Sequence, residues 1–377
     1  MGATNVPGSS SSSQWLLPIS ALHATPSKTT SQIPLEKELY DRARGVEFLF
    51  RLGVSLALPS YAMHTAATWF HRFYMRNSLE DYHRQDVAAA CIFLATKTEE
   101  CGRKLRDVAK VMCAKIAKVD PKDIADYGKE VEEAQSAILL AEEVLLEALC
   151  FDFIVHSPHA ELVDLFETHD GTPEVEEYAW SLAYDSFRTP LCVLYPPRII
   201  AAACYVLAQH IVEGPESSLS LSARISSPAP SASLPTPPSQ NFMSPKSTRF
   251  AVEFFRFNEV EMASVAEVLN ILLEFFAAQD TQGPAEYLAP IVEIQPPIIP
   301  PRAKLYEPFP RVVHSNGVKG HGSEALSLDG SSQGSSSSQP ELQSTPNKSS
   351  GRGWKPISDG NSNDHPPDKP LDRLDLS

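Results

Sequence analysis

Two charged side chains stand where they could hold another protein. Lys97 directly follows a long apolar run, and Glu142 lies at the edge of the apolar stripe of a different predicted helix. At about 100° per residue, Leu139 and Leu146 fall beside Glu142 on the helix surface, which sets this carboxylate among apolar neighbours. A cation and an anion placed in this way can make charge-assisted hydrogen bonds to a protein partner. The alternative is that Lys97 is an ordinary solvated helix end and Glu142 a partly exposed helix boundary.

Residue patterns for catalysis are missing from the sequence. It has no GxGxxG, GxxxxGKS/T or HExxH motif and no CxxC pair, so the phosphate-binding and metalloprotease templates have no match. His64 and His71 share one helix face, and His156 and His159 lie close together, but neither pair has carboxylates at ligand spacing. We interpret all four histidines as structural. The sequence therefore predicts no catalytic residue, no metal site and no cofactor.

The charge balance and the cysteine content exclude several classes of partner. The chain carries 32 Lys and Arg against 47 Asp and Glu, a net charge of -15, which repels nucleic acid and anionic membranes. Six cysteines in 377 residues are too few for a disulfide scaffold, and most lie in or beside apolar segments. No stretch approaches the roughly 20 apolar residues that a membrane-spanning helix needs. We expect a soluble intracellular protein that binds neither DNA nor membrane.

Three segments are too rich in serine and proline to form a core. They are residues 1–33, an insert at 214–248 and residues 280–377. Such segments cannot bury enough apolar surface to offset the entropy of ordering the backbone. We predict a disordered N-terminal tail, a disordered insert and a disordered C-terminal tail.

The remaining sequence predicts an all-α fold, because apolar residues recur at spacings of three and four. Two sets of five helices are expected, the first within residues 34–156 and the second within 157–279. The first set comprises 35–52, 59–75, 86–98, 104–118 and 129–149. The second comprises 158–167, 173–187, 196–212, 250–257 and 259–278.

The third helix of each set carries nearly the same apolar segment. Residues 87–95 read VAAACIFLA, and residues 200–208 read IAAACYVLA. Both segments are apolar around their full circumference, which is typical of a helix covered by protein on all sides. The matching order of the other helices favours a duplicated unit over coincidence between two alanine-rich helices.

Three segments of the first set resemble the cyclin family. Residues 69–75 (WFHRFYM), 93–100 (FLATKTEE) and 149–153 (LCFDF) are together similar to the transcriptional cyclins of the K and T kind. The resemblance covers residues 34–279 apart from the insert, and it implies tandem five-helix cyclin boxes. The family lysine and glutamate that hold a cyclin-dependent kinase fall on Lys97 and Glu142. Leu146, Phe151 and Phe153 are then expected to supply apolar contact to the kinase.

The resemblance also assigns residues inside the first cyclin box. The family alanine beside the lysine falls on Ala95, and the arginine of the first helix falls on Arg42. His71 replaces the usual acidic partner of this arginine, which leaves the pairing of Arg42 open. His210 stands where the second copy would need a lysine, so kinase binding is expected only in the first box.

The resemblance implies a regulatory protein and not an enzyme. We expect a nuclear subunit that binds and activates a transcriptional cyclin-dependent Ser/Thr kinase, one that phosphorylates the C-terminal repeat domain of RNA polymerase II. The pair would be a heterodimer that additional transcription factors can join. One alternative is a general transcription factor of the IIB kind, although the zinc ribbon and basic surface of that family have no counterpart here. Another is a cell-cycle-type cyclin, and the motifs do not separate the K, T and L types.

Overall fold

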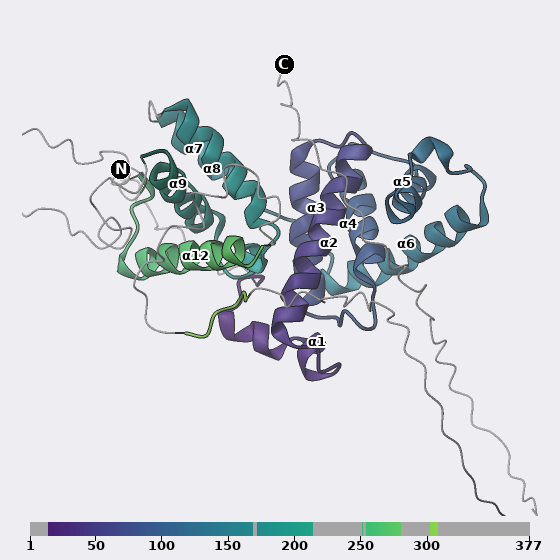
Figure 1. Cartoon of the computed structure of the whole chain (residues 1–377), viewed down its shortest axis with the longest axis horizontal. Coiled ribbons are helices and arrows are strands. Elements are labelled where there is room, and N and C mark those ends of the chain that lie inside the picture. The colour runs from purple at the N-terminus through teal and green to yellow at the C-terminus, as the bar shows by residue number, and fades with distance from the viewer. Residues whose placement is uncertain (1–13, 169–171, 214–250, 252–253, 280–301, 308–377) are drawn as a thin grey trace, which may run out of the picture. The chain divides into compact units, whose positions relative to one another are not determined.

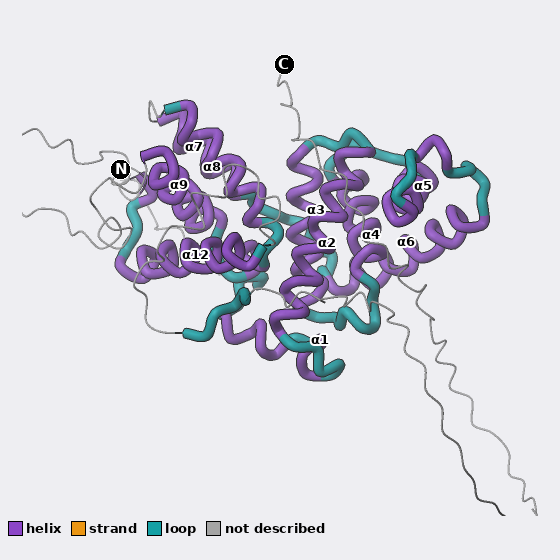
Figure 2. Tube along the Cα trace, in the orientation of Figure 1, coloured by secondary structure: helices purple, strands orange, loops and turns teal. Residues whose placement is uncertain are grey.

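The computed structural model describes residues 14–168, 172–213, 251, 254–279 and 302–307. Within these ranges the secondary structure is helical, with helices joined by loops and turns (Figure 2). The predicted all-α class is therefore confirmed for the described part of the chain. None of the helices in these ranges is both long enough and apolar enough to cross a bilayer.

Five helices form a first bundle around α4 (Figure 1). The central helix α4 contacts each of the other four, which explains why its apolar residues run around the whole circumference. Val87, Cys91 and Ala95 on α4 are almost completely buried. The five helices are α2 (Leu35–Ser55), α3 (Ser60–Tyr74), α4 (Arg84–Thr98), α5 (Leu105–Ala117) and α6 (Lys129–Ala148).

A second bundle repeats this arrangement around α9. Helix α9 contacts α7, α8 and α12, and it carries the second copy of the alanine-rich segment, buried like the first. The capping box that Asn258 and Glu261 form at the start of α12 fixes where that helix begins. The helices are α7 (Pro158–Thr168), α8 (Pro173–Ser186), α9 (Pro197–Glu213) and α12 (Glu259–Ala278). The predicted insert lies outside the described residues, as do residues 250, 252 and 253 of the predicted helix at 250–257.

The prediction of a disordered N-terminal tail is wrong for residues 14–33. This segment forms the 3-10 helix η1 (Ile19–Ala24) and the short helix α1 (Pro26–Thr29). Trp15 and Leu22 are buried, and the Thr25 hydroxyl donates a 2.7 Å hydrogen bond to Glu38 Oε2 on α2. The average composition of this segment does not predict its ordered structure, because only a few buried side chains anchor an otherwise polar segment against the bundles. Residues 1–13 lie outside the described part.

Residues 302–307 likewise depart from the predicted C-terminal tail. Leu305 and Tyr306 are 3% and 8% exposed and join the apolar core of the second bundle. The rest of the predicted tail, residues 280–301 and 308–377, lies outside the described residues.

Gly45 allows α2 to approach α3 closely. A Cβ atom at this position would lie 2.2 Å from Cζ of Phe70, which is itself fully buried. We expect Gly45→Ala to lower the free energy of unfolding by about 1 to 3 kcal/mol, because the overpacking outweighs the better helix propensity of alanine. Urea denaturation followed by circular dichroism measures the change. Gly102→Ala, whose Cβ would meet no atom within 4 Å, is the control and should change stability by less than about 0.5 kcal/mol.

Candidate functional site

Lys97 and Glu142 meet as an ion pair between the end of α4 and the middle of α6. The bond joins Lys97 Nζ to Glu142 Oε1, and the two side chains are 46% and 9% exposed. The ammonium group of Lys97 therefore reaches the surface, while the carboxylate of Glu142 lies below it and is nearly buried. Lys97 Nζ also lies 4.3 Å from the ring centroid of Phe93, within cation–π range.

The local sequence explains why both charges are held in this place. Lys97 lies in the last turn of α4, where a cation interacts favourably with the helix dipole. Thr65 on α3 donates a 2.8 Å hydrogen bond to Glu99 Oε1, which ties the segment after Lys97 to the neighbouring helix. Glu142 is nearly buried, so the ammonium of Lys97 compensates its loss of hydration. The pair is thus organised before any partner arrives.

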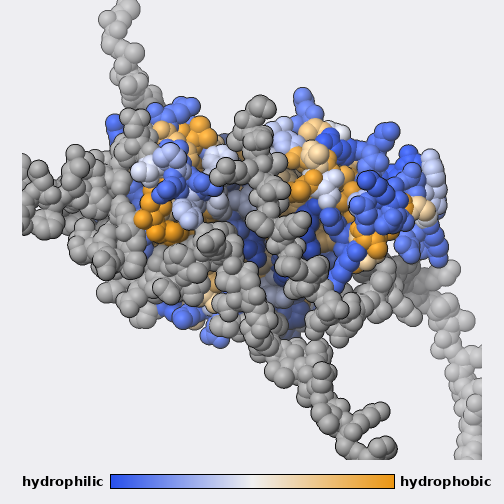
Figure 3. All heavy atoms as spheres, turned by 45° about the horizontal axis from the view of Figure 1, so that its top comes forward, coloured by the Kyte–Doolittle hydropathy of each residue, from blue (hydrophilic) through white to orange (hydrophobic). Residues whose placement is uncertain are grey.

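Apolar side chains continue from Glu142 to the end of α6 and beyond it. Leu146 is half-buried, and Phe151 is 64% exposed just after the helix ends. Cys150 and Phe151 both have left-handed backbone angles, with φ of 52° and 56°, and this turn carries Phe151 outward. Phe153 packs edge-to-face on Trp69 with ring centroids 5.8 Å apart. In the view of Figure 3, hydrophobic side chains reach the described surface in several places among hydrophilic ones.

Sequence reasoning missed two exposed apolar residues of the first bundle. Leu140, two residues before Glu142, is 65% exposed, and Ile154 is 69% exposed. The signal for Leu140 was present, because helical spacing places this leucine on the same polar side of α6 as Glu143 and Glu147. A large apolar residue among solvated carboxylates is a candidate for partner contact.

Arg42 lies in the interior, and the structure answers the open question of its pairing. Its Nη2 atom lies 2.5 Å from Oε1 of Glu38, one turn earlier on α2, and donates a 2.6 Å hydrogen bond to the Tyr74 carbonyl. Neither the arginine nor the glutamate is exposed. Glu38 therefore supplies the acidic partner that the sequence comparison sought at position 71.

Comparison with known proteins assigns a family to the part of the chain that carries this ion pair. Residues 22–154 match the family described as the cyclin N-terminal domain, and this match begins twelve residues before the predicted start of the first box at 34. Residues 22–154 form a cyclin N-terminal domain. The earlier start agrees with the ordered segment that precedes α2.

The relatives of this chain confirm the resemblance to the transcriptional cyclins. Cyclin pch1 from Schizosaccharomyces pombe is 43% identical over 204 residues, which are 54% of this chain and 59% of that protein. Cyclin-T1-4 from Arabidopsis thaliana is 37% identical over 192 residues, 50% of this chain and 35% of that protein. The chain thus spans between about a third and three fifths of the length of these relatives.

A solved structure shares the fold of the chain. The match is to a chain in the crystal structure of the yeast RNA Pol II CTD kinase CTDK-1 complex, with a TM-score of 0.52. It covers 76% of this chain and 86% of that chain at 16% identity. At this level of identity the likeness shows the fold alone.

Three buried histidines, His64, His71 and His159, lie where the two bundles meet. His71 on α3 is fully buried. Its Nε2 atom donates a 2.8 Å hydrogen bond to the carbonyl of Phe187, the residue that follows α8. Burial first, and the charge of Arg42 second, lower the pKa of His71 to about 3. His71 is therefore neutral and does not take the place of an acidic partner for Arg42.

His64 and His159 stack on each other with ring centroids 4.3 Å apart, and His64 also stacks on Phe187 at 4.7 Å. Burial is the main cause that lowers the pKa of His64 to about 2 and that of His159 to about 4. These contacts agree with a structural role for the three buried histidines, whereas His156 is exposed.

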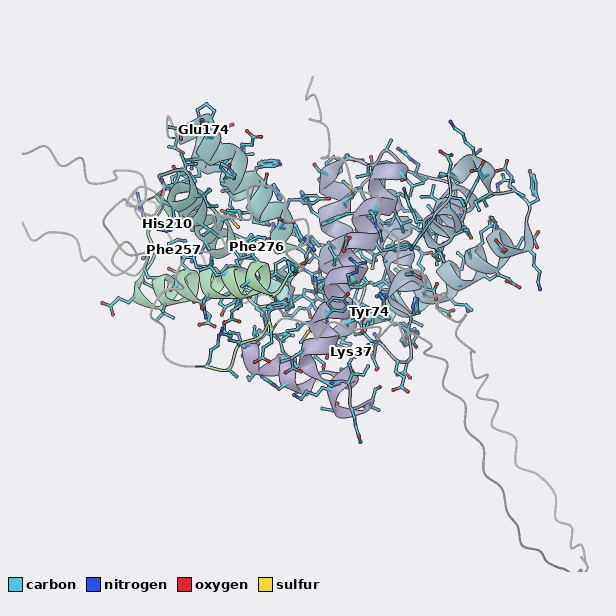
Figure 4. All side chains as sticks on the ribbon, in the orientation of Figure 1. Lys37, Tyr74, Glu174, His210, Phe257 and Phe276 are labelled. Atoms are coloured by element: carbon cyan, nitrogen blue, oxygen red, sulfur yellow. The ribbon has the colours of Figure 1, made fainter. Side chains whose placement is uncertain are left out.

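The other predicted positions have clear places in the cyclin fold. Ala95 is fully buried on α4, two residues before Lys97, where a larger side chain would push neighbouring helices away. His210, which Figure 4 labels on α9, has the place in the second alanine-rich repeat that Lys97 has in the first. Among the described residues there is no cluster of three or more histidine, cysteine, aspartate or glutamate side chains that could hold a metal ion.

Proposed function

We propose that this cyclin is the non-catalytic regulatory subunit of a nuclear cyclin-dependent Ser/Thr kinase that phosphorylates the C-terminal repeat domain of RNA polymerase II. The observation that carries the proposal is the Lys97–Glu142 ion pair, with its cation exposed and its carboxylate nearly buried. The relatives named as cyclins support a kinase regulator over a factor of the IIB kind. The substrate is inferred from the resemblance to the transcriptional cyclins, and a chain of the same fold belongs to a yeast RNA Pol II CTD kinase complex.

The mechanism follows from what a protein kinase needs for activity. Its active site requires a lysine–glutamate ion pair between a strand and helix C, and this pair forms only when helix C is held inward. Lys97 would donate to acceptors on the kinase beside helix C, and Glu142 would accept from a donor there. Because the two side chains already hold each other, less rotamer entropy is lost when the kinase binds.

Apolar and charged residues would make different contributions to kinase binding. Leu146, Phe151 and Phe153 would supply the buried contact that gives most of the affinity, as aromatic and aliphatic anchors do at protein interfaces. The ion pair would fix the register of the kinase on α4 and α6. The catalytic residues all belong to the kinase in this scheme, and the cyclin contributes only its surface.

Replacing Glu142 by glutamine tests the proposal. The cyclin is purified with a tag from the cells of its source, the kinase that comes with it is identified by mass spectrometry, and phosphorylation of a heptad-repeat peptide is measured. Glu142→Gln should weaken kinase binding about 10- to 100-fold, since a hydrogen bond to a charged group contributes about 1.5 to 3 kcal/mol.

Glu143→Gln is the matched control, because Glu143 is the adjacent residue on α6 and is exposed. It should leave kinase binding unchanged, and both variants should keep the circular dichroism of the parent. If Glu142→Gln retains full kinase binding, or if the purified kinase does not phosphorylate the repeat peptide, the corresponding part of the proposal is wrong.

A further inference from the structure

The short segment 302–307 binds the second bundle in the manner of a peptide ligand. It lies beside α12 and is drawn as the last coloured segment in Figure 1. Leu305 and Tyr306 are buried against the bundle, and the Tyr306 ring packs edge-to-face on Phe275 with centroids 5.3 Å apart. Ala303 and Lys304 before these anchors, and Glu307 after them, are exposed. A few buried anchors flanked by exposed residues are typical of a bound linear segment.

Two carboxylates on α12 receive the polar groups of this segment. Arg302 forms an ion pair with Glu267, and its Nη1 atom lies 3.1 Å from Oε1 of Glu274. The backbone N–H of Leu305 donates a 2.8 Å hydrogen bond to Oε2 of Glu274. Asn270, also on α12, holds Glu274 through a 3.1 Å hydrogen bond from its side-chain amide. Glu267 and Glu274 are seven residues apart and therefore share one face of the helix.

These carboxylates need a cation beside them. Their side chains are only 14% and 8% exposed, so each loses most of its hydration. Burial of Arg302 works against its charge, but the hydrogen bonds and charges of Glu267 and Glu274 outweigh that effect and raise the pKa of the guanidinium. The face of α12 thus combines an acidic subsite for arginine with an apolar subsite for leucine and an aromatic ring.

We propose that this face of α12 is a docking site for peptide segments in which an arginine precedes a leucine by three residues and an aromatic residue follows the leucine. Residues 302–307 occupy the site within the chain itself, and a segment of a partner protein with the same pattern takes it when they are released. The contacts made by Arg302, Leu305 and Tyr306 would all be available to such a segment. The site belongs to the second bundle and does not depend on the kinase-binding role proposed for the first.

Binding of a labelled peptide of residues 299–310 to the full chain tests this proposal. In the parent the tethered copy competes at an effective concentration in the millimolar range, so the free peptide should bind weakly. Arg302→Glu–Leu305→Asp releases the tethered copy and should tighten peptide binding by about tenfold, the gain expected if the peptide has a Kd near 0.1 mM. Fluorescence polarisation gives both affinities.

Two further variants separate docking from a general loosening of the bundle. Lys304→Glu changes the charge of an exposed residue in the same segment and should leave peptide binding at the parental level. Glu267→Arg, added to the released chain, should abolish binding of the natural peptide and restore it for a peptide carrying Arg302→Glu.

The outcome is decisive in either direction. Tighter binding by the released chain together with rescue by charge reversal establishes the site. Equal peptide affinities for the parent and the released chain, with unchanged circular dichroism, would overturn the proposal, as would binding that ignores Glu267→Arg. Should the double substitution lose its helical signal, Arg302→Glu alone is used with the same peptides, and the same absence of difference counts against the site.

Discussion

An Arg42→Met variant should lose about 3 to 5 kcal/mol of its free energy of unfolding, the cost of removing one partner from a buried ion pair. The substitution would leave Glu38 as an unexposed carboxylate without its cation, since Arg42 Nη2 at 2.5 Å and Nε at 3.1 Å both contact Glu38 Oε1. It would also leave the Tyr74 carbonyl without its 2.6 Å donor. Urea denaturation at neutral pH, followed by circular dichroism, measures the loss.

The double variant Glu38→Gln–Arg42→Met distinguishes the cost of the buried charge from the cost of lost packing. Glutamine keeps an oxygen that can accept the hydrogen bond from Thr25, now 2.7 Å from Glu38 Oε2, but it carries no charge. The double variant should therefore be more stable than Arg42→Met alone by about 1 to 3 kcal/mol. If the two variants unfold at the same urea concentration, the stability lost at position 42 comes from packing and not from the isolated carboxylate.

Arg42 also shows where prediction from sequence ended. The family resemblance assigned Arg42 a structural place in the first cyclin box, but its acidic partner was sought on the next helix, at His71. Glu38 and Arg42 lie four residues apart, a spacing that places them on one helix face, so the pair was visible in the sequence. What the sequence could not show is that the segment before α2 returns to cover this pair, with Thr25 bonded to Glu38.

The helices and the candidate site were predictable for a different physical reason. Periodic apolar residues determine the elements, and the two alanine-rich segments identify α4 and α9 as the central helices. Once α4 packs against α6, Lys97 and Glu142 must lie near each other, although 45 residues separate them in the chain. Residues 14–33 and 302–307 escaped prediction because each is held by a few anchors, such as Trp15 and Tyr306, within a polar segment. Composition averaged over a window dilutes such anchors.

Mild acid should destabilise the protein steeply, because three histidines are kept neutral in the folded state. The folded-state pKa values of His64, His71 and His159 lie near 2, 3 and 4, below the usual value of 6.5 that the unfolded chain adopts. The unfolded state therefore takes up protons first as the pH falls. The stability that these neutral histidines contribute is fully present above pH 6.5. Below pH 6.5, each histidine lowers the free energy of unfolding by about 1.4 kcal/mol per pH unit.

Asp86 acts in the opposite direction, because burial raises its folded-state pKa to about 6. The folded state then binds a proton before the unfolded state does. As the pH falls from 6 to 4, this proton restores about 1.4 kcal/mol of the free energy of unfolding per pH unit. The net loss is about 4 kcal/mol per unit just below pH 6.5 and about 3 kcal/mol per unit below pH 6. Between pH 6.5 and 5 the protein should thus lose roughly 4 to 5 kcal/mol of its free energy of unfolding, a large part of the stability of an ordinary domain.

Urea denaturation at pH 7.5, 6.5, 5.5 and 5.0 measures this loss, and two histidine variants locate its source. His159→Phe removes one titrating ring from the stack with His64 and should reduce the slope by about 1.4 kcal/mol per pH unit. His156→Ala, at an exposed position three residues earlier, should leave the slope unchanged. Stability that stays constant down to pH 5 would contradict the account.

His64 and His71 on α3 face Phe187 and His159 from the second bundle. Acid should therefore weaken the contact between the bundles before it affects the core of either one.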